Sequence, residues 1–247
     1  MSRTAKNILI VIGAILVTAC LIAVHIVGIS ARKPLVCKGL QVTISDSASN
    51  SFISREDVRR YLDSEYGQYR EVSLDSLDLD RIEQVLESKS AINRTEAFVT
   101  KDGMLNITIT QRRPVVRFQG SHGGYYADAE GRSFALQKSY ASYVPVVDGK
   151  IPAITDTVGI VRTTQLVNFL ENDALWKGKF VQIRIDEKGD IILIPREGNE
   201  RFIIGQPCKI EEKARKMEWY YTHIIPEKGS GHYKTVDLRF DGQIVCR

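Results

Sequence analysis

The longest apolar stretch of the chain lies close to its amino terminus. Residues 7–30 contain no Asp, Glu, Lys or Arg, and basic residues flank them at Arg3, Lys6, Arg32 and Lys33. At a rise of ~1.5 Å per residue, a helix over this stretch would be roughly 35 Å long, which is enough to cross the hydrocarbon core of a bilayer. The pattern therefore predicts one transmembrane helix over residues 7–30. The side chains of this membrane anchor include Ile8, Leu16, Leu21 and Ile29.

Two other interpretations of this stretch fit less well. A cleaved signal peptide has an apolar region of about 7–15 residues, which is shorter than the run observed here. Residues 17–20 resemble a lipoprotein attachment box only loosely, because the sequence stays apolar through Ile29. An uncleaved anchor is therefore favoured. The head over residues 1–6 is short enough to stay in the cytoplasm, so we expect the body beyond Lys33 to be exported to the periplasm.

The first part of the body predicts the order strand, helix, helix, strand, strand. Ser54 followed by Asp57 forms a helix-capping pattern, and Gly67 is typical of a helix end. Asp102 and Gly103 give a strong hairpin signal between two strands. The expected elements are a strand over 36–45, a helix over 54–66, a helix over 74–86 capped by Ser73 or Asp75, and strands over 93–101 and 104–111.

The second part of the body is dominated by short strands between turn signals. Over residues 164–170, Leu166, Phe169 and Leu170 fall on one helical face, and apolar residues recur at helical spacing over 210–224. The expected strands cover residues 125–128, 133–136, 144–147, 180–186, 190–194, 201–204 and 235–240. The fold class predicted for the body is α+β.

The last predicted strand, over residues 235–240, is a candidate binding surface. Only a short tail over residues 241–247 follows it, and this tail is too short to form another long element. We therefore expect the strand to form a sheet edge whose unpaired N–H and C=O groups accept a strand from a partner. The alternative is a strand that is paired on both sides, followed by a frayed terminus.

The charge of the chain argues against nucleic-acid binding. The whole sequence has 34 Lys and Arg against 30 Asp and Glu, and residues 1–33 contain four basic and no acidic side chains. The body is therefore neutral and has no global positive field. The four cysteines, Cys20, Cys37, Cys208 and Cys246, show no metal-ligand spacing. Free thiols are expected, with a Cys208–Cys246 disulfide left open.

Candidate catalytic patterns are weak. Residues 30–33 read S-x-x-K, but they lie at the membrane edge without the companion sequences of penicillin-binding enzymes. Ser121 and His122 lie in a glycine-rich segment that is expected to be a turn between strands, not the strand-turn-helix of a nucleophile elbow. His223 and His232 fit no metal-binding spacing. The sequence predicts a protein that is not an enzyme and has no cofactor, metal or small-molecule substrate.

Four short segments, in order along the chain, resemble the bacterial cell-division protein family FtsQ/DivIB. They cover residues 105–116, 126–134, 144–147 and 236–240, the last reading Val-Asp-Leu-Arg-Phe. The resemblance implies a single transmembrane helix over 7–30, a POTRA-like domain over 36–112 and a β-rich domain with a late helix over 113–247. The chain departs from the family pattern at residues 111–113, where an acidic residue is usual, and at residues 88–92.

The resemblance implies a scaffold of the division machinery in the inner membrane, at the division site. Its partners would be small single-span proteins of the FtsB and FtsL type, together with other division proteins, and the last strand would capture a partner segment. The partner-binding residues expected on this basis are Glu218, Val236, Leu238, Arg239, Phe240, Asp241, Gly242 and Ile244. Glu218 is equally well explained as an ordinary surface residue. The alternative function is a POTRA-type periplasmic chaperone for outer-membrane or secreted polypeptides.

Overall fold

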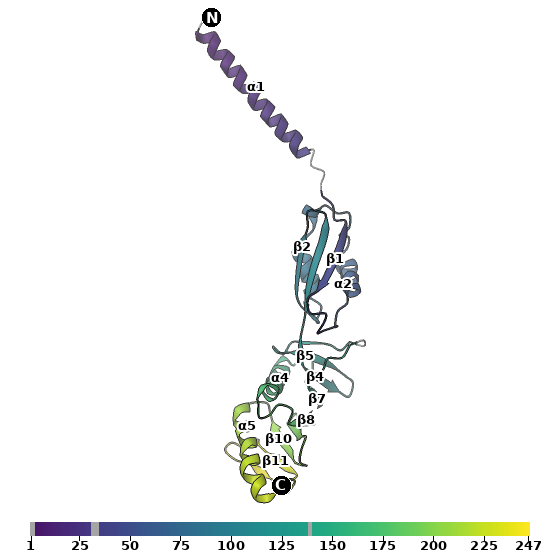
Figure 1. Cartoon of the computed structure of the whole chain (residues 1–247), viewed down its shortest axis with the longest axis vertical. Coiled ribbons are helices and arrows are strands. Elements are labelled where there is room, and N and C mark those ends of the chain that lie inside the picture. Colours follow the sequence, from purple (N-terminus) through teal and green to yellow (C-terminus); the bar gives the residue numbers. More distant parts are fainter. Residues whose placement is uncertain (1–2, 31–34, 138–139) are drawn as a thin grey trace.

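The computed structural model describes residues 3–30, 35–137 and 140–247 (Figure 1). Helix α1 covers Arg3–Ser30, and its side chains are described between residues 12 and 25. Among the residues described, no helix is both long enough and apolar enough to cross a membrane. The transmembrane helix predicted over residues 7–30 is therefore not confirmed.

The first unit of the body is a small sheet with two helices on one face. Its elements are β1 (Gly39–Ile44), α2 (Arg55–Tyr61), α3 (Leu79–Glu87), β2 (Ile92–Val99) and β3 (Met104–Gln111), with a π-helical turn over Leu62–Tyr66 and a 3-10 turn over Leu74–Ser76. Within the described residues the strand order is β1-β3-β2, with β1 parallel and β2 antiparallel to β3. Alternate residues of β3 pack with apolar side chains of α2 and α3. The predicted order strand, helix, helix, strand, strand is confirmed.

The helix starts in this unit follow local capping chemistry. The Asp57 N–H donates to Ser54 Oγ at 3.1 Å and the Ser54 N–H donates to Asp57 Oδ2 at 3.0 Å, which confirms the predicted capping box. The predicted cap of the second helix is wrong. Residues 74–76 form a separate 3-10 turn, and α3 starts only after Asp78, whose carboxylate accepts the Arg81 N–H at 2.9 Å.

The second unit is built on one large mixed sheet. Its elements are β4 (Pro114–Gly120), β5 (Gly123–Asp128), β6 (Ser133–Ala135), β7 (Val146–Gly149), α4 (Thr157–Asn172), β8 (Phe180–Ile185), β9 (Ile191–Pro195), β10 (Arg201–Gly205), α5 (Ile210–Trp219), a π-helical turn over Tyr220–Ile224, α6 (Ile225–Lys228), β11 (Thr235–Asp237) and β12 (Val245–Cys246). Within the described residues the strand order is β12-β11-β10-β9-β8-β7-β4-β5-β6. The α+β class of the body, with a POTRA-like topology followed by a β-rich unit, is confirmed.

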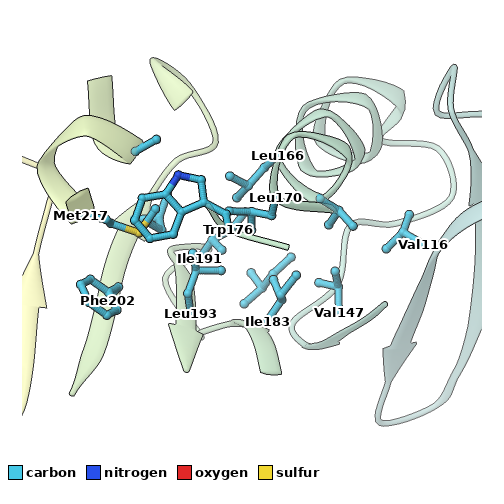
Figure 2. Packing of buried hydrophobic residues seen from close by; sticks show 14 of the residues in the cluster. Val116, Val147, Leu166, Leu170, Trp176, Ile183, Ile191, Leu193, Phe202 and Met217 are labelled. Carbon is cyan, nitrogen blue, oxygen red and sulfur yellow. The ribbon is translucent and has the colours of Figure 1, made fainter. Parts of the chain in front are cut away.

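Helices α4 and α5 cover one face of this sheet and share a core with it. Figure 2 shows Trp176 between Leu170 of α4 and Met217 of α5, and only 3% of Trp176 is exposed. Phe202 of β10 and Leu193 of β9 complete the core from the sheet side. The core therefore fixes α5 against the strands that lead to the carboxyl terminus.

Several elements of the second unit differ from the sequence prediction. β4 was not predicted, although it lies between β7 and β5 and its Val116 and Phe118 are fully buried. Helix α4 starts at Thr157 instead of residue 164, because Asp156 caps it by accepting the Gly159 N–H at 2.9 Å. The predicted last strand is shorter than expected, and β12 follows it.

A buried amide at the end of β3 holds the segment between β1 and α2 in the first unit. Gln111 is 1% exposed, and its Oε1 accepts the N–H groups of Phe52 and Ile53 at 2.8 and 2.9 Å. Its Nε2 donates to Asp46 Oδ1 at 3.1 Å and to the Asn50 carbonyl at 2.8 Å. Only a side chain with both donors and acceptors satisfies these four groups. This accounts for Gln111 at a position where the FtsQ/DivIB pattern usually has an acidic residue.

The segment held by Gln111 carries Phe52 into an aromatic cluster between the units. The Phe52 ring meets the rings of Tyr126, Phe134 and Tyr140 edge-on, with centroids 5.4, 5.3 and 4.8 Å apart. Because Tyr125 and Tyr126 are successive residues of β5, their side chains point to opposite faces: Tyr125 packs in the core of the second unit and Tyr126 in that of the first.

An ion-pair cluster lies beside these rings. Asp128 is 4% exposed and accepts from Arg112 Nη1 at 3.1 Å and from Arg132 Nε at 3.0 Å. Arg112 also donates to the Ser90 carbonyl of the first unit at 2.9 Å. The two units are thus connected by packed rings around Phe52 and by the shielded carboxylate of Asp128.

We predict that Gln111→Glu destabilises the protein by about 2–4 kcal/mol, because a carboxylate at 111 meets the Asp46 carboxylate and leaves the Asn50 carbonyl without a donor. Urea unfolding at pH 7 measures this change. Gln41→Glu is the matched control, since Gln41 is exposed on β1, and its expected effect is below about 0.5 kcal/mol. Equal stability of the two variants would contradict the role assigned to Gln111.

Candidate functional site

The carboxyl terminus folds back onto the strand that was expected to be the sheet edge. β11 pairs in parallel with β10 and antiparallel with β12, in the register Val236 with Cys246 and Asp237 with Val245. Thr235 and Arg247 exchange two backbone hydrogen bonds, of 2.9 and 3.0 Å. The prediction that residues 235–240 form the free edge is therefore wrong: β11 is paired on both sides, as the alternative interpretation held, although the residues that follow it are ordered and not frayed.

The exposed edge of this sheet is instead β12. It ends the strand order, and among the described residues no strand pairs with its outer side. In an antiparallel ladder, hydrogen-bonded and non-hydrogen-bonded residue pairs alternate. Because Thr235 and Arg247 form a hydrogen-bonded pair, the neighbouring pair of Val236 and Cys246 does not, and the N–H and C=O of Cys246 point outward. The same alternation turns the backbone groups of Ile244 outward.

A groove of about 470 Å³ runs beside this edge on the helix side of the sheet. Its walls come from α5, from the π-helical turn that follows and from the terminal segment. Trp219 is 53% exposed, and its ring stacks on His223 with centroids 3.6 Å apart. The residues that line the groove are Glu212, Arg215, Lys216, Trp219, Ile224, Gly242 and Ile244. The site thus combines a free backbone edge with an exposed aromatic ring.

Lys216 of α5 and Lys209, the residue just before this helix, hold the turn that precedes β12. The buried Lys216 donates from Nζ to the Phe240 carbonyl at 2.6 Å and pairs with Glu212 at 2.9 Å. The Lys209 ammonium binds the Asp241 carboxylate at 2.8 Å, and this hydrogen bond lowers the pKa of Asp241. Gly242 occupies the left-handed region at φ +67°, which the turn requires. The groove wall formed by Gly242 and Ile244 is therefore fixed to α5.

Arg239 and Asp237 form an ion pair on the opposite face of the sheet. Arg239 Nε and Nη2 donate to the two oxygens of Asp237 at 2.9 and 2.6 Å, and Nη1 donates to Asp190 at 2.8 Å. The Arg239 hydrogen bonds lower the pKa of Asp237. The Arg239 stem crosses Gly205, where a Cβ would lie 2.7 Å from Arg239 Cγ. The guanidinium predicted to bind a partner is thus already paired within the molecule.

The predicted site residues other than Arg239 separate into three groups. Val236 and Leu238 are fully buried in the core, so their side chains are not available to a partner. Glu218 is exposed on α5 but does not line the groove. The structure brings together Gly242 and Ile244 in the groove, with Phe240, which is 46% exposed, and Asp241 in the adjoining turn.

Sequence reasoning missed Trp219, Arg215 and Ile224 as groove residues. Trp219 falls between the core positions Met217 of α5 and Tyr220 of the π-helical turn that continues it, so helical spacing alone would have placed it outside the core. An exposed tryptophan on a helix next to a terminal strand was the signal that could have found the groove.

Of the other candidate groups, the S-x-x-K segment over residues 30–33 lies largely outside the described residues. Ser121 Oγ and His122 Nδ1 are 2.8 Å apart in the exposed turn between β4 and β5. In the part of the chain that the structure describes, no three His, Cys, Asp or Glu side chains are grouped to hold a metal ion. Cys208 and Cys246 are free thiols, so the disulfide left open by the sequence is not formed. Burial raises the pKa of the Cys246 thiol.

We predict that Asp237→Asn lowers the free energy of unfolding by about 1–3 kcal/mol at pH 7. The folded-state pKa of Asp237 is lowered, so the stability that its charge contributes is present above its unfolded pKa of about 3.9 and is lost as the pH falls through the folded pKa. Urea unfolding between pH 7 and pH 3 should therefore show the difference between wild type and variant shrinking below about pH 4. A difference that is independent of pH, or as small as that of the exposed control Asp75→Asn, would contradict the ion pair.

Comparison with known families agrees with this architecture. Residues 113–247 match the family model described as FtsQ/DivIB, C-terminal related, and residues 35–110 match a model of the POTRA-like domain. No curated protein matches the chain. The first match covers more than half of the sequence, so the family resemblance is confirmed and the chain belongs to the FtsQ/DivIB-related family.

Proposed function

We propose that this protein is a non-catalytic scaffold of the bacterial division machinery, and that it recruits single-span partners of the FtsB and FtsL type at the β12 edge. The observation that carries the proposal is the pairing of β12 with β11, which leaves the outer side of the terminal strand next to a groove lined by both apolar and charged side chains. Membership of a cell-division family with a POTRA-like domain supports the scaffold role.

An extended partner segment fits this site by adding as the next strand. Its backbone would pair with the outward N–H and C=O groups of Cys246 and Ile244. Alternate side chains of an added strand point to the helix face of the sheet. There they would meet Ile244 and the exposed ring of Trp219, which supply the apolar contact area. Backbone pairing gives affinity, and the groove selects the side chains of the partner.

The amino-terminal helix bears on where the protein is located. Residues 7–30 contain no charged side chain, and α1 runs through them without a break. We infer from the sequence that this helix anchors the protein in the inner membrane, with the body in the periplasm and the protein concentrated at the division site. Membrane fractionation tests the anchor: deletion of residues 1–30 should release the protein, and a deleted form that stays in the membrane fraction would contradict it.

We predict that Trp219→Ala and Ile244→Asp each weaken binding of a soluble FtsB–FtsL pair about thirtyfold, because each removes apolar contact area from the wall of the groove. Titration of the full chain in detergent measures the dissociation constants. Phe98→Ala and Val181→Asp are matched controls, since both residues are exposed hydrophobics outside the groove, and their affinity should equal that of wild type. If only the control variants lost binding, the partner would bind outside the groove and the proposed site would be wrong.

A second variant pair isolates the backbone contact. Cys246→Pro removes the outward N–H of residue 246, which takes no part in pairing with β11, and proline is tolerated at edge positions whose N–H faces solvent. We expect binding about three- to tenfold weaker than for Cys246→Ala, which keeps the N–H. The two variants should unfold at similar temperatures. Equal affinities would show that the partner does not pair with the β12 backbone.

A further inference from the structure

A second strand edge, in the POTRA-like unit, is occupied by side chains of the protein itself. β2 lies at the edge of the three-stranded sheet in the strand order β1-β3-β2. The Thr95 N–H donates to Glu87 Oε1 at 2.8 Å, and the Ala97 N–H donates to Glu83 Oε1 at 2.7 Å. Both carboxylates come from α3, four residues apart and thus on one face of the helix.

These two amides are the ones that an added strand would use. Thr95 and Ala97 are two residues apart on β2, so their N–H groups point to the same side. That side faces away from β3, because both hydrogens reach α3 instead. The two carboxylate oxygens thus stand where the carbonyl oxygens of a partner strand would lie.

The anchoring of α3 keeps the carboxylates in place. Ile82 and Leu86, each adjacent in sequence to one of the glutamates, are fully buried against the sheet. The strand also starts with a register shift between Ile92 and Arg94, and such irregularities disfavour further pairing at an edge.

We propose that Glu83 and Glu87 close the β2 edge to strand addition, so that the POTRA-like unit does not capture extended polypeptides there. The two sheets of the body then differ in whether the backbone groups at these edges, β2 and β12, are free to pair with a partner. The β2 amides are taken by carboxylates, whereas the outward groups of β12 have no partner among the described residues. The POTRA-like unit of this chain is a fixed spacer at that edge, which opposes the chaperone function considered for it.

Amide exchange on the full chain in detergent, followed by NMR, tests the closure. In Glu83→Ala/Glu87→Ala, the Thr95 and Ala97 amides should exchange about tenfold faster than in wild type, because they lose their acceptors. Glu83→Gln/Glu87→Gln should keep the protection, since a carboxamide oxygen also accepts. Gln84→Ala, on the exposed side of α3, is the matched control. Unchanged exchange in the double alanine variant would overturn the proposal.

Binding of a permanently unfolded polypeptide, reduced and carboxymethylated lactalbumin, gives the second readout. The double alanine variant should bind it about tenfold more tightly than wild type, with the Thr95 and Ala97 resonances shifted. Wild-type binding at these two amides, or no gain in the variant, would overturn the closure. Affinity for the FtsB–FtsL pair should be the same in wild type and variant, so this outcome is separate from the test of the β12 site.

Discussion

Two backbone hydrogen bonds between Thr235 and Arg247 hold the carboxyl terminus against β11, and the binding surface depends on this pairing. They turn the last residues into a strand, bury the backbone of β11 on both sides and leave the outward groups of β12 at the rim. Two lysines then hold the connecting turn: Lys216 of α5 donates to the Phe240 carbonyl, and Lys209, just before α5, pairs with Asp241. Without the return of the chain, neither the edge nor the groove wall formed by Ile244 would exist.

The packing of the fold and the candidate site use different residues of the same short segment. Val236 and Leu238 fill the core, Asp237 and Arg239 form an ion pair on the opposite face, and only the residues after Phe240 reach the groove. In the first unit, by contrast, Glu83 and Glu87 accept the edge amides of β2. The Gln111 amide holds the segment that carries Phe52, and the rings around Phe52 join the two units, so both sheet edges belong to one connected body.

Local chemistry explains which parts of this structure the sequence could predict. The Ser54 cap and the Asp102-Gly103 hairpin depend on neighbouring residues, and both were found. The sequence does not predict β4, because Pro114 marks a break between the units, although Val116 and Phe118 alternate in the way typical of a half-buried strand. β12 has only two residues, too few for a periodic pattern, and it exists because β11 offers a partner. Trp219 lines the groove because α5 packs beside the terminal turn, and local sequence does not reveal that tertiary contact.

Hydrogen exchange of the full chain, with and without a soluble FtsB–FtsL pair, tests the central claim most directly. The β12 edge predicts that the amide of Cys246 becomes protected on binding, together with that of Ile244, while the amides of Thr95 and Ala97 on β2 keep their exchange rates. A complex that forms without any change at Cys246 would contradict strand addition at the carboxyl terminus.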